Sequence, residues 1–384
     1  MACRRSRPAP LGQPGRDAPR IRLRSVGIAP EYRVTGQFGP LPPGRTGAAL
    51  AGAGMAVPEQ VRSNAAIAAR LGVDEQWITR RTGTRERHVA AAGQRLDQFA
   101  AQAAAAALAQ SGVAAADVDA VLVGTTSAEE MSPHAAPLVA ADIGAIGAAA
   151  IDVSAACTGF LSCLVMGASM IESGRARTVL AIGADMLTRY LDEDDPGSAM
   201  LFGDGAGAVV LTACDQFSGV GPATLSSDGS RRELIRLSRD DLLIRMDGPT
   251  VYRHAVQLMS DVAVQAAGRA GLAISDIDVF VFHQANSRII DAVGHRLSLD
   301  EARVVDVVSS FANTSAASLP IALAAAQRDG RLHDGDHVML AAFGAGLVWG
   351  GVVITWGRPA WLQRQNDLAA PSDRLHSQND RASW

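Results

Sequence analysis

The sequence contains no lysine, so its 35 basic residues are all arginines. A pyridoxal-phosphate Schiff base, a Walker-A phosphate loop and a lysine nucleophile each need a primary amine, and this absence excludes all three. Cysteine is also scarce: Cys3, Cys157, Cys163 and Cys214 stand at irregular spacings that match neither a disulfide framework nor a zinc site. No apolar run has transmembrane length and no signal-peptide core is present, which favours a reducing cytoplasm.

The chain has 384 residues, is 48% hydrophobic and carries a formal net charge of -4. This length allows one large domain or two fused halves with a substantial core. The charge is too nearly balanced to indicate nucleic acid as the main partner. Residues 1–45 are rich in Arg, Pro and Gly without periodicity and are predicted to form a disordered or dispensable extension, and residues 358–384 a polar tail. Between them, short apolar strands alternate with Ala-rich helices, which is typical of an α/β fold.

A strand–turn–helix pattern surrounds Cys157. The apolar strand at 151–153 runs into the small residues 154–156, and apolar spacing predicts a helix over roughly 158–173. Small neighbours let a substrate approach the sulfur, and a helix N-terminus favours the thiolate and lowers the pKa of a Cys. This favours a nucleophile, but most unpaired Cys are buried structural residues, so the stretch alone leaves both interpretations open.

The sequence repeats itself. Residues 112–123 return as 271–282, and the strand and turn before Cys157 return as 304–307 leading to 313–318. A third match, of 174–183 with 330–342, follows in the same order. The shared order predicts two related halves, at 46–220 and 221–357, whose equivalent loops meet about a pseudo-twofold axis.

Three reactive side chains are brought together by this repeat. Cys157 and Asn313 fall at matching places, each opening a helix after an apolar strand, and His283 directly follows the strand at 279–282. Strand ends are where an α/β fold builds its site, so the three are predicted to converge. A lone His is more often structural than catalytic, and its place beside a Cys and an Asn at matched repeat positions reverses that expectation.

From about residue 46 to 357 the chain resembles 3-oxoacyl-ACP synthase III, a ketosynthase of the thiolase-like superfamily. The resemblance implies a thiolase-like five-layered αβαβα fold of two duplicated halves. The motifs that carry it are residues 77–83 (an entrance motif), 154–160 around Cys157, 202–207, 283–286, 313–318 and 343–346.

The same motifs separate this family from its relatives. A thiolase needs a second catalytic Cys in the C-terminal half, and no Cys follows Cys214. Elongating ketosynthases have a His where this chain has Asn313, and chalcone-synthase-like enzymes have a Pro in the Gly-rich signature that here reads 343–347 without one. Cys157 is retained, which argues against a non-catalytic ketosynthase partner subunit. A non-decarboxylating acyltransferase of specialised metabolism stays an alternative, although intact His283 and Asn313 speak against it.

The resemblance implies a decarboxylative condensation. An acyl starter thioester acylates Cys157, with the backbone N–H groups of Cys157 and Ala345 as the oxyanion hole. Malonyl-ACP then loses carbon dioxide, His283 and Asn313 donate hydrogen bonds to the enolate, and 3-oxoacyl-ACP is released. No permanently bound cofactor or metal is needed, because CoA or ACP phosphopantetheine carries the substrates. Fatty-acid initiation and polyketide priming share this chemistry.

The family motifs also imply contacts with the carrier. Trp77 offers a stacking face and Arg81 a phosphate partner at the mouth of a pantetheine tunnel, with Asn286 as a further pantetheine contact. Arg288 and Arg253 are expected to hold the acidic acyl carrier protein.

Two departures from the family pattern bear on the substrate. Pro196 replaces the family's phosphate-binding Arg, which makes a carrier-bound starter more plausible than a CoA-bound one. Ser132, beside Met131, replaces a Phe of some acetyl-specific relatives in the dimer-interface loop that closes the starter pocket. This predicts a homodimer with a pocket for starters longer or more branched than acetyl, unless neighbouring side chains refill the space.

Overall fold

The computed structural model describes residues 46–215 and 219–357, all within one compact unit. The predicted extension at 1–45 and the predicted tail at 358–384 lie outside the described residues. Across the part of the chain that is described, no helix has both the length and the apolar character to cross a membrane.

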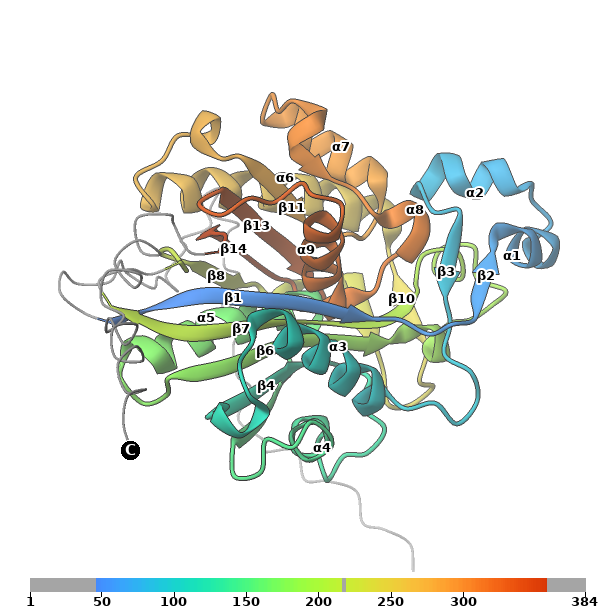
Figure 1. Cartoon of the computed structure of the whole chain (residues 1–384). Helices are drawn as coiled ribbons and strands as arrows, with labels where there is room; N and C mark the ends of the chain where they lie inside the picture. The colour runs from blue at the N-terminus through green and yellow to red at the C-terminus, as the bar shows by residue number, and fades with distance from the viewer. Residues whose placement is uncertain (1–45, 216–218, 358–384) are drawn as a thin grey trace, which may run out of the picture. The chain divides into compact units, whose positions relative to one another are not determined.

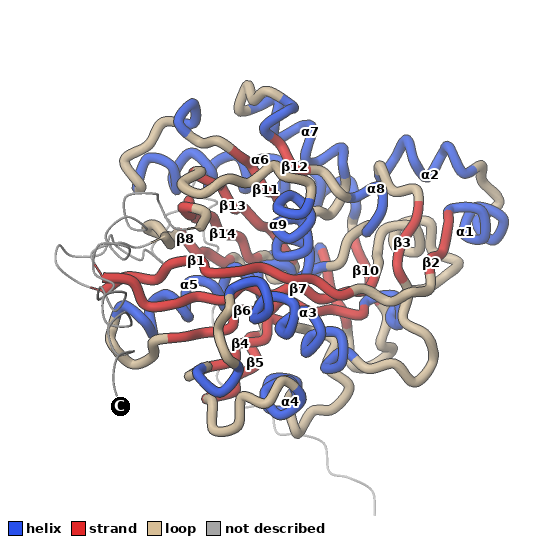
Figure 2. Tube along the Cα trace, in the orientation of Figure 1, coloured by secondary structure: helices blue, strands red, loops and turns tan. Residues whose placement is uncertain are grey.

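Two five-stranded mixed sheets form the framework (Figures 1 and 2). In each sheet three neighbouring strands run parallel, and two further strands follow, each antiparallel to the strand before it. The first sheet has the order β1 (Thr46–Ala56), β7 (Asp204–Asp215), β6 (Thr178–Met186), β4 (Ala120–Gly124), β5 (Ala149–Val153). The second has the order β8 (Thr224–Ser227), β14 (Val348–Thr355), β13 (His337–Gly344), β11 (Val279–Phe282), β12 (Val304–Val305).

The two strand orders match position by position. The strand that ends the first repeat match, β4, corresponds to β11, and its parallel neighbours β5 and β6 correspond to β12 and β13. The predicted α/β fold of two duplicated halves is therefore confirmed. The predicted boundary near residue 220 falls in the connection between β7 and β8 and stays a prediction.

Helices fill the layers on either side of the sheets (Figure 1). Helices α5 (Gly159–Glu172) and α9 (Ser318–Arg328) share one apolar core with the facing sides of both sheets. Helices α3 (Leu96–Ser111) and α4 (Ala135–Asp142) cover the outer face of the first sheet, and α6 (Gly248–Arg269) and α7 (Ser287–Arg296) that of the second. Successive strand residues alternate between the central and outer cores, as the period of two in a strand requires.

Smaller elements surround the entrance to the central layer. They are β2 (Val61–Ser63), α1 (Asn64–Leu71), α2 (Glu75–Thr82), β3 (Glu86–His88), the β9 (Ile235–Leu237) and β10 (Ile244–Met246) hairpin, and α8 (Val308–Phe311). Short 3-10 turns precede both central helices: η2 (Ala156–Thr158) before α5 and η7 (Ser315–Ala317) before α9.

Glycines in the sheets let the central helices approach the strands closely. A Cβ at Gly183 on β6 would lie 2.1 Å from the carbonyl oxygen of Ala316, and one at Gly207 on β7 would lie 2.8 Å from the backbone nitrogen of Ile321. Both distances are too short for a real side chain, so the position of α9 and of the turn before it depends on these glycines.

We predict that Gly207→Ala destabilises the protein by about 1–3 kcal/mol, because the added methyl meets α9 backbone that cannot move away cheaply. Gly268→Ala is the matched control: it lies in α6 with no atom within 4 Å of the added Cβ. The free energy of unfolding of that variant should instead rise by roughly 0.5–1 kcal/mol, because Ala has a higher helix propensity than Gly. Urea unfolding of both variants measures the difference, and equal stability for the two would contradict the close packing.

Candidate active site

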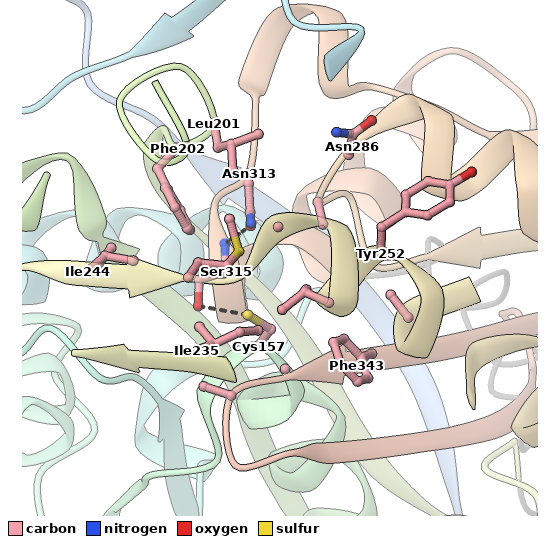
Figure 3. Close-up of a pocket in the computed structure, with 18 of the residues that line it drawn as sticks. Cys157, Leu201, Phe202, Ile235, Ile244, Tyr252, Asn286, Asn313, Ser315 and Phe343 are labelled. Atoms are coloured by element: carbon pink, nitrogen blue, oxygen red, sulfur yellow. Dashed lines mark hydrogen bonds between the residues drawn. The ribbon is translucent and has the colours of Figure 1, made fainter. Parts of the chain in front are cut away.

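The three predicted side chains line one cavity of about 1160 Å³ between the central turns and the second sheet. Cys157 lies on η2, His283 follows β11, and Asn313 precedes η7. Figure 3 shows Cys157 and Asn313 on either side of Ser315, with Tyr252 and Asn286 farther from Ser315. The predicted convergence of Cys157, His283 and Asn313 on one space is what the geometry shows.

Cys157 is held by a tight turn and by the Gly-rich loop that follows β13. Ala156, just before it, has a φ of 45°, a left-handed conformation that turns the chain sharply into η2. A Cβ at Gly344 would lie 2.9 Å from the Cys157 nitrogen, so only glycine allows this approach. The helix predicted over roughly 158–173 is confirmed as α5, which begins at Gly159.

The thiol of Cys157 is deeply enclosed, although the residue as a whole keeps some exposed surface. Burial raises the pKa of the Cys157 thiol to about 11, and the hydrogen bond from Ser315 and the N–H groups of Cys157 and Ala345 oppose that rise. The expectation that the helix N-terminus lowers this pKa is wrong, because desolvation of the thiolate outweighs the nearby donors. Cys157 is therefore a neutral thiol before it reacts.

Ala345 presents its backbone N–H to the sulfur of Cys157. The described non-glycine residues with positive φ are Ala156, Leu242, Ser298, Ala312 and Ser315. Ala345 is not one of them, so alanine occupies this position without backbone strain and keeps the donor. Two N–H groups thus converge beside the sulfur, the arrangement that an oxyanion hole requires.

Asn313 has a fixed amide. Its backbone is tied to the 201–203 segment, since its N–H donates to the Leu201 carbonyl at 2.9 Å and its carbonyl accepts from the Gly203 N–H at 3.0 Å. Its side-chain Oδ1 accepts from the Ser315 N–H at 2.8 Å. A backbone N–H can only donate, so the oxygen must face Ser315, and Nδ2 is left as a donor toward the cavity.

The His283 ring is held by a hydrogen bond to Ser318. Its Nδ1 lies 2.6 Å from the Ser318 hydroxyl at the start of α9, and both residues are buried. Burial lowers the pKa of His283 to about 4, so the ring is neutral near pH 7. With Nδ1 occupied by Ser318, Nε2 is the ring nitrogen that remains for a ligand.

The predicted register of the repeat around Cys157 and Asn313 needs one correction. Ala156 and Ser315 are the first residues of η2 and η7, and both have positive φ, 45° and 52°. The structural counterpart of Cys157 is therefore Ala316, and Asn313 lies three residues earlier. Asn313 reaches the centre because its segment pairs with Phe202, not because it repeats the place of Cys157.

The predicted carrier-binding residues Trp77, Arg81, Asn286, Arg288 and Arg253 all line the cavity. The Arg81 guanidinium lies over the Trp77 ring at 4.2 Å from its centroid. Asn286 joins two elements there, because its Nδ2 donates to the Arg81 carbonyl at 3.0 Å and its Oδ1 accepts from the Arg288 N–H at 2.9 Å. Pro196 lines the same cavity.

Met131 and Ser132 do not line the cavity of a single chain. Both are exposed, with 73% of Met131 accessible, and Met131 Sδ accepts a hydrogen bond of 3.3 Å from Arg239, which does line the cavity. Their predicted role in the starter pocket stays a prediction that depends on a second copy of the chain.

An apolar wall beside Cys157 was not predicted from the sequence. It combines residues of η3 (Leu187–Tyr190), the 201–202 segment and the β9–β10 hairpin, namely Leu187, Leu201, Phe202, Ile235 and Ile244. Figure 3 labels the last four of these. The hairpin lies outside the segments that repeat in the sequence, so the repeat gave no signal for it. Within the described residues, no group of three His, Cys, Asp or Glu side chains could hold a metal ion.

The buried neutral ring of His283 makes stability depend on pH. The folded-state pKa, about 4, lies below the ordinary value of 6.5, so the unfolded chain takes up a proton first as the pH falls. We predict a loss of roughly 3 kcal/mol from this group between pH 7 and pH 4. Urea unfolding at several pH values in this range measures the free energy of unfolding of the native protein and of His283→Gln. The variant should lose less of this free energy between pH 7 and pH 4, by the same roughly 3 kcal/mol. Parallel pH curves for the two proteins would contradict it.

The chain is similar to known proteins over most of its length. The family described as 3-oxoacyl-[acyl-carrier-protein (ACP)] synthase III matches residues 151–229, and its C-terminal domain matches residues 267–356. A beta-ketoacyl-[acyl-carrier-protein] synthase III of Bradyrhizobium diazoefficiens is 40% identical over 317 residues, which cover 79% of this chain and 97% of the relative.

Solved structures give the same result. The 3-oxoacyl-(acyl carrier protein) synthase III of Pseudomonas aeruginosa is 42% identical with a TM-score of 0.77, over 82% of this chain and 99% of that one. The priming beta-ketosynthase of a polyketide biosynthetic pathway is 33% identical with a TM-score of 0.79, over 83% of this chain and 98% of that one. The thiolase-like fold expected from the sequence is confirmed by these similarities.

Proposed function

The chain belongs to the 3-oxoacyl-[acyl-carrier-protein] synthase III family, and from this premise we propose that Cys157 carries the acyl starter and His283 and Asn313 promote the decarboxylation. The protein is a condensing enzyme of the acyltransferase class, acting in the priming step of fatty-acid or polyketide synthesis. The observation that supports the residue roles best is the convergence of a thiol, two backbone N–H groups, an imidazole and a fixed amide on one cavity.

The first half-reaction loads the starter. The sulfur of Cys157 attacks the thioester carbonyl, and the N–H groups of Cys157 and Ala345 hold the oxyanion of the tetrahedral intermediate. Collapse of this intermediate expels the carrier thiolate and leaves an acyl group on Cys157. Because the site is enclosed, these donors act in a low dielectric and stabilise the developing charge more than they would in water.

The second half-reaction forms the new carbon–carbon bond. Asn313 Nδ2 and His283 Nε2 donate hydrogen bonds to the thioester oxygen of malonyl-ACP, which becomes the enolate oxygen when carbon dioxide leaves. For His283 to donate from Nε2, the Ser318 hydroxyl donates to Nδ1. The carbanion attacks the acyl group on Cys157, releases 3-oxoacyl-ACP and restores the sulfur.

The carrier enters past Trp77, and the mouth of the cavity favours ACP over CoA as the starter carrier. Arg81 already covers the Trp77 ring, and Pro196 supplies no charge or donor for a nucleotide phosphate. Arg253 and Arg288 lie at the same mouth and are suited to an acidic carrier protein.

The functional unit is a homodimer in the cytoplasm. Its starter pocket accepts acyl groups longer or more branched than acetyl. The edge strand β5 supports a dimer, since Ile151 on it is 43% exposed and no other strand among the described residues pairs with its outer edge. The apolar wall of Leu187, Phe202, Ile235 and Ile244 lines the cavity that contains Cys157. Met131 and Ser132 of a second copy would complete the pocket.

Intact-protein mass spectrometry tests the loading step directly. The protein is incubated with a mixture of acetyl, longer and branched acyl groups on CoA and on ACP, and the mass added to it identifies the preferred starter. We expect one acyl group per chain, longer than acetyl, taken from ACP, and no adduct on Cys157→Ala. An adduct that persists on Cys157→Ala would show that the nucleophile is another residue, and strict acetyl loading would contradict the roomier pocket.

A further inference from the structure

Asp185 is a fully buried carboxylate to which the mechanism above gives no role. It stands near the carboxyl end of β6, with 0% of its surface exposed, and no cation forms an ion pair with it among the residues the structure describes. Burying an unpaired carboxylate costs several kcal/mol unless donors surround it. Its position beside the nucleophile therefore calls for an explanation.

The Asp185 carboxylate joins the two halves of the site. Its Oδ1 accepts from the Thr126 N–H at 2.9 Å, from the Ser127 hydroxyl at 2.7 Å and from the Thr125 and Thr126 hydroxyls at 3.2 Å. Its Oδ2 faces η7 and accepts from the Ala316 N–H at 3.1 Å. Burial raises the pKa of Asp185, while Thr126, Ser127 and Ser315 lower it in part. Asp185 therefore takes up a proton more readily than an ordinary Asp does.

The Ser315 hydroxyl stands between Asp185 and the nucleophile. Its Oγ donates to Cys157 Sγ at 3.5 Å (Figure 3), and hydrogen bonding by the same side chain lowers the pKa of Asp185. Ser315 is held in place by its left-handed φ of 52° and by its N–H bond to Asn313. In this geometry the Ser315 hydroxyl donates to the sulfur. When the hydroxyl turns its one hydrogen toward Asp185, its oxygen can accept from the thiol, and this second orientation joins the thiol proton to the carboxylate.

We propose that Asp185 receives the Cys157 proton through the Ser315 hydroxyl during acyl loading, and returns it when condensation releases the sulfur. On loading, the S–H bond breaks, its proton moves to Ser315 Oγ and the Ser315 proton moves to Asp185 Oδ2, while the sulfur–carbonyl bond forms. The expelled carrier thiolate takes its proton from solvent. On condensation the acyl–sulfur bond breaks, and the same two transfers run backwards. This inference rests on the proposed function.

The surroundings favour this path over direct transfer to His283. Within the described chain, Ser315 is the one side chain that hydrogen-bonds to Cys157 Sγ. His283 is neutral and its Nδ1 is already engaged by Ser318. The titratable groups around the pair are His283 and Tyr190, and the remaining partners of Asp185 are hydroxyl and backbone N–H groups. Ser315 therefore contacts the reacting atom, and Asp185 is a positioning residue that acts through it.

Two rates separate a proton path from a structural role. The first is alkylation of Cys157 by iodoacetamide between pH 7 and 9, which reports the thiolate fraction. The second is single-turnover acyl loading. Asp185→Asn removes the negative charge that helps to raise the Cys157 pKa, so alkylation should accelerate. Loading should slow by about a hundredfold, because the proton acceptor is gone. A structural role would slow both rates together.

Ser315→Gly provides an independent test, because glycine adopts the left-handed φ of 52° without strain while its lack of a side chain removes the hydroxyl. Both rates should fall, by about ten- to a hundredfold, since a donor to the thiolate and the path to Asp185 are lost. Thr125→Val is the matched control: it removes a hydroxyl from Asp185 on the side away from Cys157 and should keep the native ratio of the two rates.

The proton path is overturned if Asp185→Asn lowers both rates or leaves loading unchanged, or if Ser315→Gly loads acyl groups at the native rate. Failure of the proposed function looks different: the native protein would then form no acyl adduct that depends on Cys157, whatever residue stands at 185 or 315.

Discussion

The site depends on the close approach of two turns, η2 and η7, in the layer between the sheets. Glycine makes that approach possible: a Cβ at Gly124 would lie 2.4 Å from the carbonyl carbon of Gly159, and one at Gly183 would lie 2.1 Å from the Ala316 oxygen. Since each turn rests directly on strand backbone, neither can shift without disturbing the central core. Cys157 and Ser315 are thereby fixed 3.5 Å apart, although 158 residues separate them in the chain.

Enclosure of the cavity sets the chemistry of both ionisable groups that face the substrate. It raises the pKa of Cys157 to about 11 and lowers that of His283 to about 4, so the resting site holds a neutral thiol and a neutral imidazole. Reaction of this thiol then requires oriented hydrogen-bond donors and an acceptor for the thiol proton. In the mechanism we propose, the N–H groups of Cys157 and Ala345 and the fixed amide of Asn313 are the donors, and Asp185 takes the proton.

Much of this arrangement could be predicted from the sequence, because it follows from local patterns and from their repetition. Apolar spacing located α5, and the repeated 112–123 and 271–282 segments indicated two halves with matching strand orders. Cys157 and His283 were located from the strands that precede them, β5 and β11. Their convergence required no knowledge of side-chain contacts.

Other features depend on packing and could not be predicted in this way. The pKa of Cys157 follows from desolvation, which no local pattern reveals, and the helix N-terminus alone indicated the wrong direction. The register of Asn313 is set by pairing with Phe202, 111 residues away, so the helix-opening pattern misplaced it relative to Cys157. The wall residues Ile235 and Ile244 lie on a hairpin outside the repeat.

The central claim is that one sulfur receives the starter and then gives it up to the condensation. The direct measurement is to isolate the acyl-enzyme, add malonyl-ACP without further starter, and quantify carbon dioxide, 3-oxoacyl-ACP and residual acyl-Cys157 in the same sample. The account predicts one carbon dioxide and one 3-oxoacyl-ACP for each acyl group lost from Cys157. Loss of the acyl group as free acid, or product formed while acyl-Cys157 stays constant, would contradict it.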